Sequence, residues 1–164
     1  MDPRTARNVF IVGALPHTRR MTGRWHPWRY MRDKHPDIDV RFTNCGDEGL
    51  RGRWTSDGIE IDRTSNQRER RYTLAHEIVH IGRGPVPDHP HYAMREERAV
   101  DRITARLLIP IDDLIDVLAW NRYRVDDEAA EELWVDLECL KIRVQNLTEA
   151  ERRYIDSELE RRSP

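Results

Sequence analysis

Two histidines, His76 and His80, stand four positions apart, and Glu77 follows the first of them directly. In an α-helix this spacing places both imidazoles on one face, one turn apart, because each residue advances the helix by about 100°. Two imidazoles in this position can bind one zinc ion at roughly 2.0–2.1 Å. Zinc lowers the pKa of water towards about 7, and the Glu77 carboxylate can accept the proton as the water attacks a peptide carbonyl. The pattern therefore predicts a zinc site with Glu77 as the catalytic base.

A catalytic zinc site needs a third protein ligand and a position left open for water. Glu97 offers a carboxylate on the next predicted helix, and Asp101 stands four residues later on the same face. An antiparallel helix pair would bring this face against the two histidines. We then expect Glu97 as the third ligand and Asp101 as an outer acceptor for an imidazole N–H, most naturally that of His76. Two alternatives stay open: Glu96 replaces Glu97 if the helix is rotated, or these acids are ordinary solvated side chains.

Four further residues are candidates for contact with a substrate. His89 and His91 belong to the proline-rich stretch between the two helices, which would position a metal ligand poorly. With Tyr92 and Arg95 they are better candidates for donors towards an oxyanion, and a solvated loop is the alternative. Zinc suits two imidazoles and a carboxylate, but Mn²⁺ or Fe²⁺ could occupy the same set. The sequence holds no glycine-rich phosphate loop and no serine nucleophile elbow that would indicate other chemistry.

The elements that must hold these side chains follow from the hydrophobic pattern. Residues 38–43, 50–56 and 59–62 read as strands, and the Asp57-Gly58 pair between the last two is a strong hairpin signal. A short helix opened by Pro27 is expected before them. Further helices are expected over residues 65–81, 92–108, 112–121, 127–134, 136–146 and 148–161. The predicted fold is α+β: a small N-terminal antiparallel sheet, a zincin-like catalytic helix pair and a C-terminal helical bundle.

Charge is spread unevenly over the 164 residues. Residues 1–34 carry eight basic and two acidic side chains, whereas residues 125–164 carry six basic and twelve acidic ones. From this and the element pattern we predict a basic, extended or mobile segment over 1–24, a metallopeptidase core over 25–125 and an acidic helical subdomain over 126–164. Because acidic side chains repel phosphate, no direct nucleic-acid binding is expected.

The two helices expected over residues 127–134 and 136–146 meet at a tight turn and could resemble a helix-turn-helix. A DNA-reading pair would carry basic side chains at the phosphates, whereas acidic residues crowd this pair. We expect these helices to serve in packing or in docking a protein, such as the basic surface of a repressor.

Cysteine content and hydropathy bear on the compartment. Cys45 and Cys139 are far apart and show no paired spacing, which argues against a disulfide framework and for a reducing compartment. No apolar run approaches the length of a membrane-spanning helix, and the short run at 9–15 makes a poor signal peptide. We expect a cytoplasmic protein with no membrane partner.

Three stretches around the candidate ligands are together typical of one family. Residues 70–80 read RRYTLAHEIVH, residues 97–101 read ERAVD and residues 105–110 read ARLLIP. Over about residues 50–125 the chain resembles the ImmA/IrrE family of bacterial and phage metallopeptidases, with Val100 where the family usually has alanine. The resemblance implies a gluzincin-like fold with His76, His80 and Glu97 as zinc ligands and Glu77 as the catalytic residue.

The resemblance also implies a biological role. Members of this family cleave helix-turn-helix transcriptional repressors and so release a mobile element from immunity or a stress regulon from repression. The expected partner is therefore a protein substrate of this kind, and a phage or mobile element is the expected source of the gene. The alternative is a non-proteolytic, metal-dependent regulator that binds a repressor or a toxin–antitoxin partner. The presence of Glu77 favours the peptidase, since a binding module needs no general base.

Overall fold

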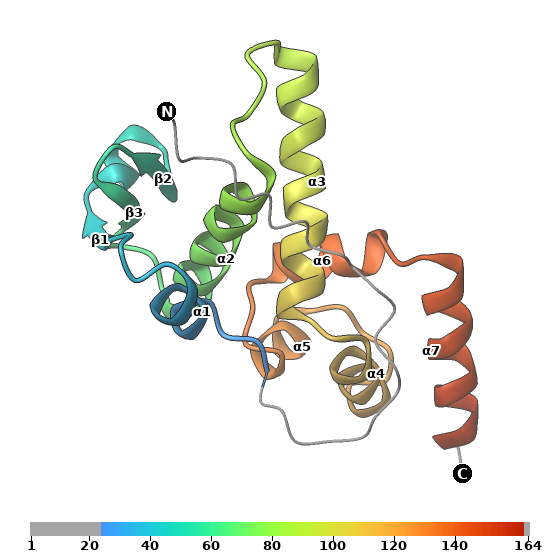
Figure 1. The fold of residues 1–164 in the computed structure, drawn as a ribbon. Helices are drawn as coiled ribbons and strands as arrows, with labels where there is room; N and C mark the ends of the chain where they lie inside the picture. Colours follow the sequence, from blue (N-terminus) through green and yellow to red (C-terminus); the bar gives the residue numbers. More distant parts are fainter. Residues whose placement is uncertain (1–23, 163–164) are drawn as a thin grey trace.

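The structure is a computed structural model that describes residues 24–162 (Figure 1). Its first part holds helix α1 (Pro27–Lys34), strand β1 (Val40–Thr43), the short 3₁₀ helix η1 (Cys45–Glu48) and strands β2 (Gly52–Thr55) and β3 (Gly58–Asp62). Six helices follow: α2 (Gln67–Arg83), α3 (Pro90–Leu108), α4 (Ile111–Trp120), α5 (Asp127–Glu132), α6 (Leu137–Gln145) and α7 (Glu149–Arg162). The α+β prediction is confirmed. The predicted segment 1–24 lies outside the described residues except for its last residue.

The sheet is mixed, so the prediction of an antiparallel sheet was wrong in one pairing. Its strand order is β1-β3-β2, in which β2 and β3 form the expected antiparallel hairpin and β1 runs parallel to β3. The connection between β1 and β2 spans the width of a strand, and β3 fills the space between them. Ile59 and Ile61 are fully buried, which explains why β3 takes the centre.

The hairpin turn lies one residue earlier than the Asp57-Gly58 signal suggests. Thr55 pairs with Gly58, so the two turn residues are Ser56 and Asp57, and Gly58 opens β3 with φ of 126°. A Cβ atom on Gly58 would lie 2.2 Å from the carbonyl oxygen of Asp39. Glycine is therefore required here both for its positive φ and for the close approach of the chain that leads into β1.

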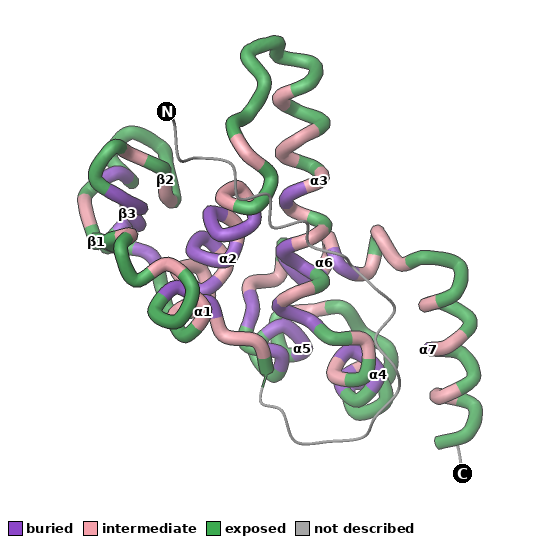
Figure 2. Tube along the Cα trace, viewed as in Figure 1, coloured by how far each residue is buried: buried purple, intermediate pink, exposed green. Residues whose placement is uncertain are grey.

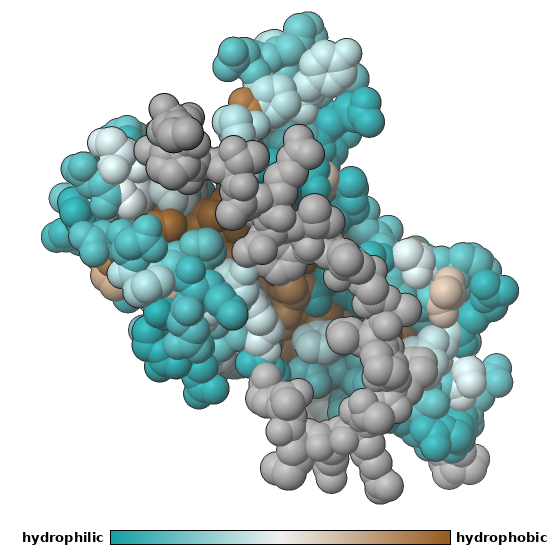
Figure 3. Space-filling view, viewed as in Figure 1, coloured by the Kyte–Doolittle hydropathy of each residue, from teal (hydrophilic) through white to brown (hydrophobic). Residues whose placement is uncertain are grey.

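Two hydrophobic clusters flank α2. A small one joins α1, the sheet and α2 through Met31, Ile59, Ile61, Leu74 and Ile78. A larger one joins α2 and α3 to the C-terminal helices and includes Ala75, Ala105, Leu114, Leu133 and Leu140. Helix α2 is therefore packed on two sides, and several of its residues are buried, drawn purple in Figure 2. On the face drawn in Figure 3, hydrophobic residues gather in the middle of the molecule and hydrophilic residues cover the outer parts.

Capping residues set where the helices begin. Asn66 caps α2 in a capping box with Glu69, one residue later than Ser65, where we expected the helix to begin. At α7, Thr148 and Glu151 form a capping box with hydrogen bonds in both directions, close to the expected helix start at residue 148. Helix α3 begins at Pro90, two residues before the expected start, with His89 as its N-cap. None of the described helices combines the length and apolarity needed to cross a membrane.

Candidate active site

The candidate site lies where α2 and α3 pack side by side, joined by the loop that follows α2 (Figure 1). His76 and His80 project from one face of α2, one turn apart, and Glu97 faces them from α3. The two Nε2 atoms are 3.1 Å apart. Glu97 Oε2 lies 3.2 Å from His76 Nε2, and Glu97 Oε1 lies 3.4 Å from His80 Nε2. Two imidazole nitrogens from α2 and both oxygens of one α3 carboxylate therefore face one another, and each nitrogen lies close to a different oxygen.

These separations fit a shared metal ion. Ligand atoms at about 2.0–2.1 Å from a tetrahedral zinc ion lie roughly 3.3–3.4 Å from one another, and the shortest contacts between these three residues, 3.1, 3.2 and 3.4 Å, are of this size, with a different Glu97 oxygen nearest each histidine. Two imidazole nitrogens and a carboxylate oxygen form a donor set that divalent metals accept. The Glu97 side chain is 43% exposed, so solvent reaches the centre from the α3 side. The residues present can hold a metal ion and leave room for a further ligand.

The structure places Glu97, and not its neighbour Glu96, at the histidines. The Glu96 carboxylate turns to Arg83 at the end of α2 and accepts hydrogen bonds from two guanidinium nitrogens, one of them at 2.8 Å. The alternative in which a rotated helix exchanges the two acids is therefore not the arrangement observed. Because the Glu96 carboxylate is paired with Arg83, the carboxylate of Glu97 is the one that faces the two histidines.

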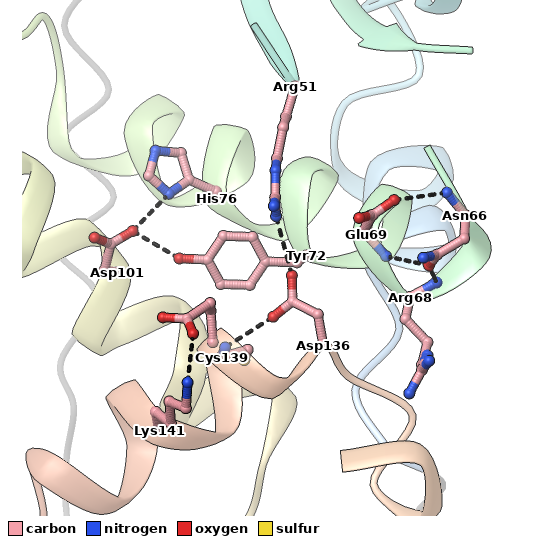
Figure 4. Close-up of polar contacts among 11 residues, drawn as sticks. Arg51, Asn66, Arg68, Glu69, Tyr72, His76, Asp101, Asp136, Cys139 and Lys141 are labelled. Carbon is pink, nitrogen blue, oxygen red and sulfur yellow. Dashed lines mark hydrogen bonds and ion pairs between the residues drawn. The ribbon is translucent and has the colours of Figure 1, made fainter. Parts of the chain in front are cut away.

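Asp101 sits behind His76, as expected, and it has a second partner in Tyr72 (Figure 4). Its Oδ1 atom lies 3.2 Å from His76 Nδ1 and accepts a hydrogen bond from the Tyr72 hydroxyl at 2.6 Å. Burial alone would raise the pKa of Asp101, but the His76 ring and the Tyr72 hydroxyl outweigh it and lower this pKa. Burial likewise would lower the pKa of His76, but the carboxylate of Asp101, with those of Glu77 and Glu97, raises it.

Glu77 lies on the side of α2 that faces the sheet. The residue is only 8% exposed, and burial raises the pKa of its carboxyl group, with a further rise from Glu97 that His76 opposes. Among the described residues, none donates a hydrogen bond to the Glu77 carboxylate, so both oxygens are available to a water molecule. A carboxylate with a raised pKa and no fixed partner is suited to accept and return a proton.

Strand β2 lies very close to α2 near Glu77. A Cβ atom on Gly52 would lie 2.3 Å from Thr73 Cγ2 and 3.8 Å from Glu77 Oε1. The indole N–H of Trp54 donates to the backbone carbonyl of Glu77 at 3.5 Å. Our sequence reasoning assigned no role to Gly52, although a glycine inside a strand pattern is a signal of close backbone approach.

The candidates for substrate contact lie on the part of α3 that extends away from the body of the protein (Figure 1). His91 belongs to the first turn of the helix, so our placement of it in a loop was wrong, whereas Tyr92 lies in the helix as expected. His89 caps that turn by accepting a hydrogen bond from the His91 N–H at 3.3 Å. All four candidates, including Arg95, are exposed. In the described structure none of them contacts the three candidate ligands, and their role towards an oxyanion stays a prediction.

Comparison with known proteins is decisive at the level of the family. The Peptidase_M78 family model, described as an IrrE N-terminal-like domain, matches residues 33–145. The match begins near the end of α1, continues through the sheet, α2 and α3, and ends at the last residue of α6, so it includes every candidate site residue named above. No curated protein and no solved structure matches the chain. Because the family model covers well over half of the 164 residues, the chain belongs to the Peptidase_M78 family.

Proposed function

We propose that this protein is a zinc-dependent endopeptidase that acts in the cytoplasm. The observation that carries the proposal is the joint presence of the three-donor set and of a buried, unpartnered Glu77 directly beside it. A structural metal site has no use for such a carboxylate, whereas hydrolysis of a peptide bond needs a group that moves protons. Membership of a peptidase family supports the same reaction class.

Each residue has a distinct part in this reaction. His76, His80 and Glu97 would hold the metal, which when bound supplies Lewis-acid activation of water and of a peptide carbonyl. Glu77 accepts the proton of the attacking water and then delivers it to the nitrogen of the leaving amine. The raised pKa of Glu77 brings its two protonation states closer in energy near neutral pH, which helps a group that must both take and release a proton.

The sheet provides a surface along which a substrate can align. Within residues 24–162, strand β2 is an edge strand, since it pairs on one side only, with β3. The contact from Trp54 to the Glu77 carbonyl holds this strand along α2. An extended peptide that adds to the free edge would gain main-chain hydrogen bonds and would pass next to Glu77. We propose this edge as the binding place of the substrate backbone.

We further propose that the substrate is a helix-turn-helix repressor of a phage, mobile element or stress regulon. The motif resemblance described above supports this substrate class. The acidic surface of α5–α7 suits a protein with the basic surface that DNA binding requires. In the structure α5 and α6 bury Ala129, Ala130, Cys139 and Leu140 in the larger cluster. These helices therefore serve at least in packing.

The test combines metal content with cleavage. Wild type, Glu77→Gln and His80→Ala are purified, and their zinc, manganese and iron contents are measured by elemental analysis. Each is then incubated with helix-turn-helix repressors encoded by neighbouring genes, and fragments are identified by mass spectrometry. We expect about one zinc ion per chain in wild type and Glu77→Gln, loss of the ion in His80→Ala, and cleavage by wild type alone. Metal binding without cleavage of any repressor would favour the non-proteolytic regulator, and absence of metal from wild type would overturn the site.

A further inference from the structure

Helices α2 and α3 meet through matching rows of side chains. Tyr72, His76 and His80 occupy one face of α2 at intervals of one turn, with ring centroids 6.0 Å and 4.8 Å apart. Glu97 and Asp101 occupy the facing side of α3, again one turn apart. Glu97 meets the two histidines, and Asp101 meets His76 and Tyr72. The row of ring side chains therefore extends one helical turn beyond the candidate metal ligands, to Tyr72. Figure 4 shows Tyr72 and His76 beside Asp101.

The Tyr72 hydroxyl makes a strong contact in a buried setting. Its 2.6 Å hydrogen bond to Asp101 has the length of a charge-assisted O–H···O⁻ bond. The tyrosine ring packs against the larger hydrophobic cluster, and this packing restricts the movement of the hydroxyl group. Burial, with the neighbouring Asp101 carboxylate, raises the pKa of Tyr72, so the phenol stays neutral and remains a donor. Among the described residues, only Tyr72 and His76 contact the Asp101 carboxylate.

The Asp101 oxygen that Tyr72 holds is also the one that faces His76. It lies 3.2 Å from His76 Nδ1 as an ion-pair contact, and this buried nitrogen has no hydrogen-bond partner in the described structure. The Asp101 side chain is 33% exposed, so without a second anchor the carboxylate can turn towards solvent. The His76 ring would then lose the acceptor that favours a proton on Nδ1. A proton on Nε2 instead would remove the lone pair that points towards His80 and Glu97.

We propose that Tyr72 is a positioning residue of the metal centre. Its hydroxyl fixes the Asp101 carboxylate, and Asp101 in turn holds His76 in the tautomer and orientation that leave Nε2 free for the metal. This role rests on the proposed metal site but not on peptide hydrolysis. Sequence reasoning missed Tyr72, although its position four residues before His76 places it on the same helix face.

The first test is Tyr72→Phe, which keeps the ring and its packing and removes only the hydroxyl. Tyr154→Phe is the matched control, because Tyr154 also donates to a carboxylate, that of Asp112, but between α7 and α4 rather than between α2 and α3. Zinc affinity is measured by competition with a chromophoric chelator, and circular dichroism verifies that both variants fold. We expect Tyr72→Phe to weaken zinc binding about 10-fold, the lower end of the 10–100-fold that loss of a ligand's own outer partner costs, because Tyr72 acts through Asp101, and Tyr154→Phe to leave it unchanged.

Two further measurements separate positioning from a general structural role. In an Asp101→Ala background, Tyr72→Phe is expected to change zinc affinity less than about twofold, since coupled residues are not additive. In metal-free protein, the ¹⁵N NMR signals of the His76 ring should report Nδ1–H in wild type and a mixture of tautomers in Tyr72→Phe. The NMR result stands even if no peptide is cleaved, so failure of this proposal is distinguishable from failure of the proposed function. Unchanged affinity and tautomer in Tyr72→Phe, or full additivity with Asp101→Ala, would overturn it.

Discussion

Substitution of Gly52 by alanine is expected to displace Glu77, the proposed catalytic base, because Gly52 lies against the side of α2 that faces the sheet. A Cβ atom on Gly52 would lie 2.3 Å from Thr73 Cγ2 and 3.0 Å from the carbonyl oxygen of Glu60 on the paired strand. Thr73 is one helical turn before Glu77 on α2, and both face the sheet. Neither neighbour is the far end of a long, flexible side chain, so the new methyl group must push β2 and α2 apart.

The size of the effect follows from these distances. Carbon atoms in contact prefer about 3.5–4.0 Å, so an approach at 2.3 Å requires a separation of the two elements by more than about 1 Å. Overpacking of this kind destabilises a core by about 1–3 kcal/mol. A misplacement of about 1 Å near the reacting groups can reduce a rate about 100-fold. Metal affinity should fall less than cleavage, because His76 and His80 face α3 rather than the sheet.

Urea unfolding of Gly52→Ala and cleavage of the repressor by zinc-saturated enzyme measure both effects. Gly49→Ala is the control, because Gly49 has φ of 76° and no heavy atom within 4 Å of an added Cβ. It should lose about 1 kcal/mol through backbone strain and keep its cleavage rate. The reasoning is refuted if Gly52→Ala unfolds and cleaves like wild type, or if Gly49→Ala loses as much activity as Gly52→Ala.

Three other predictions concern the ligand choice, the start of α2 and the effect of pH. Glu97→Gln should weaken zinc binding by more than about 100-fold, which is a larger loss than removal of an outer partner causes. In Glu96→Gln the zinc affinity should stay within about twofold of wild type. Competition with a chromophoric chelator measures both affinities. Asn66→Ala removes the cap of α2 and should lower the free energy of unfolding by about 1 kcal/mol in thermal or urea melts; an unchanged stability would contradict the cap. Burial raises the pKa of Glu151, but hydrogen bonds from a backbone N–H and from Arg143 lower it to about 2, below the ordinary 4.5. Its stabilising effect is therefore complete above about pH 4.5 and is lost as the pH falls towards 2. Urea unfolding at pH 6 and pH 3 should show a smaller loss of stability in Glu151→Gln than in wild type, and an equal loss in both would refute this assignment.

Much of the local structure could be predicted from the sequence, because neighbouring residues determine it. The four-residue spacing of His76 and His80, inside a helical pattern, places both rings on one face before any packing is known. The capping box at Thr148 and the turn signal before Gly58 act over three or four residues, and the helix and the hairpin they indicate are present. Membership of the peptidase family is likewise supported by short motifs that the sequence shows directly.

The choice between Glu96 and Glu97 required the tertiary structure. A rotation of α3 by about 100° would exchange these adjacent acids, and only the packing of α3 on α2, with Arg83 at Glu96, selects one. The parallel pairing of β1 with β3 depends on which strand fills the centre of the sheet, and no neighbouring residues encode that.

Tyr72 and Gly52 acquire their importance only through contacts with distant parts of the chain. Tyr72 is 29 residues from Asp101 along the chain and yet touches it, and Gly52 meets Thr73 across the gap between a strand and a helix. The sequence by itself determined the chemistry available on α2. The tertiary structure decided which side chains from α3 and β2 complete and shape the site, because those contacts depend on how whole elements pack and not on local spacing.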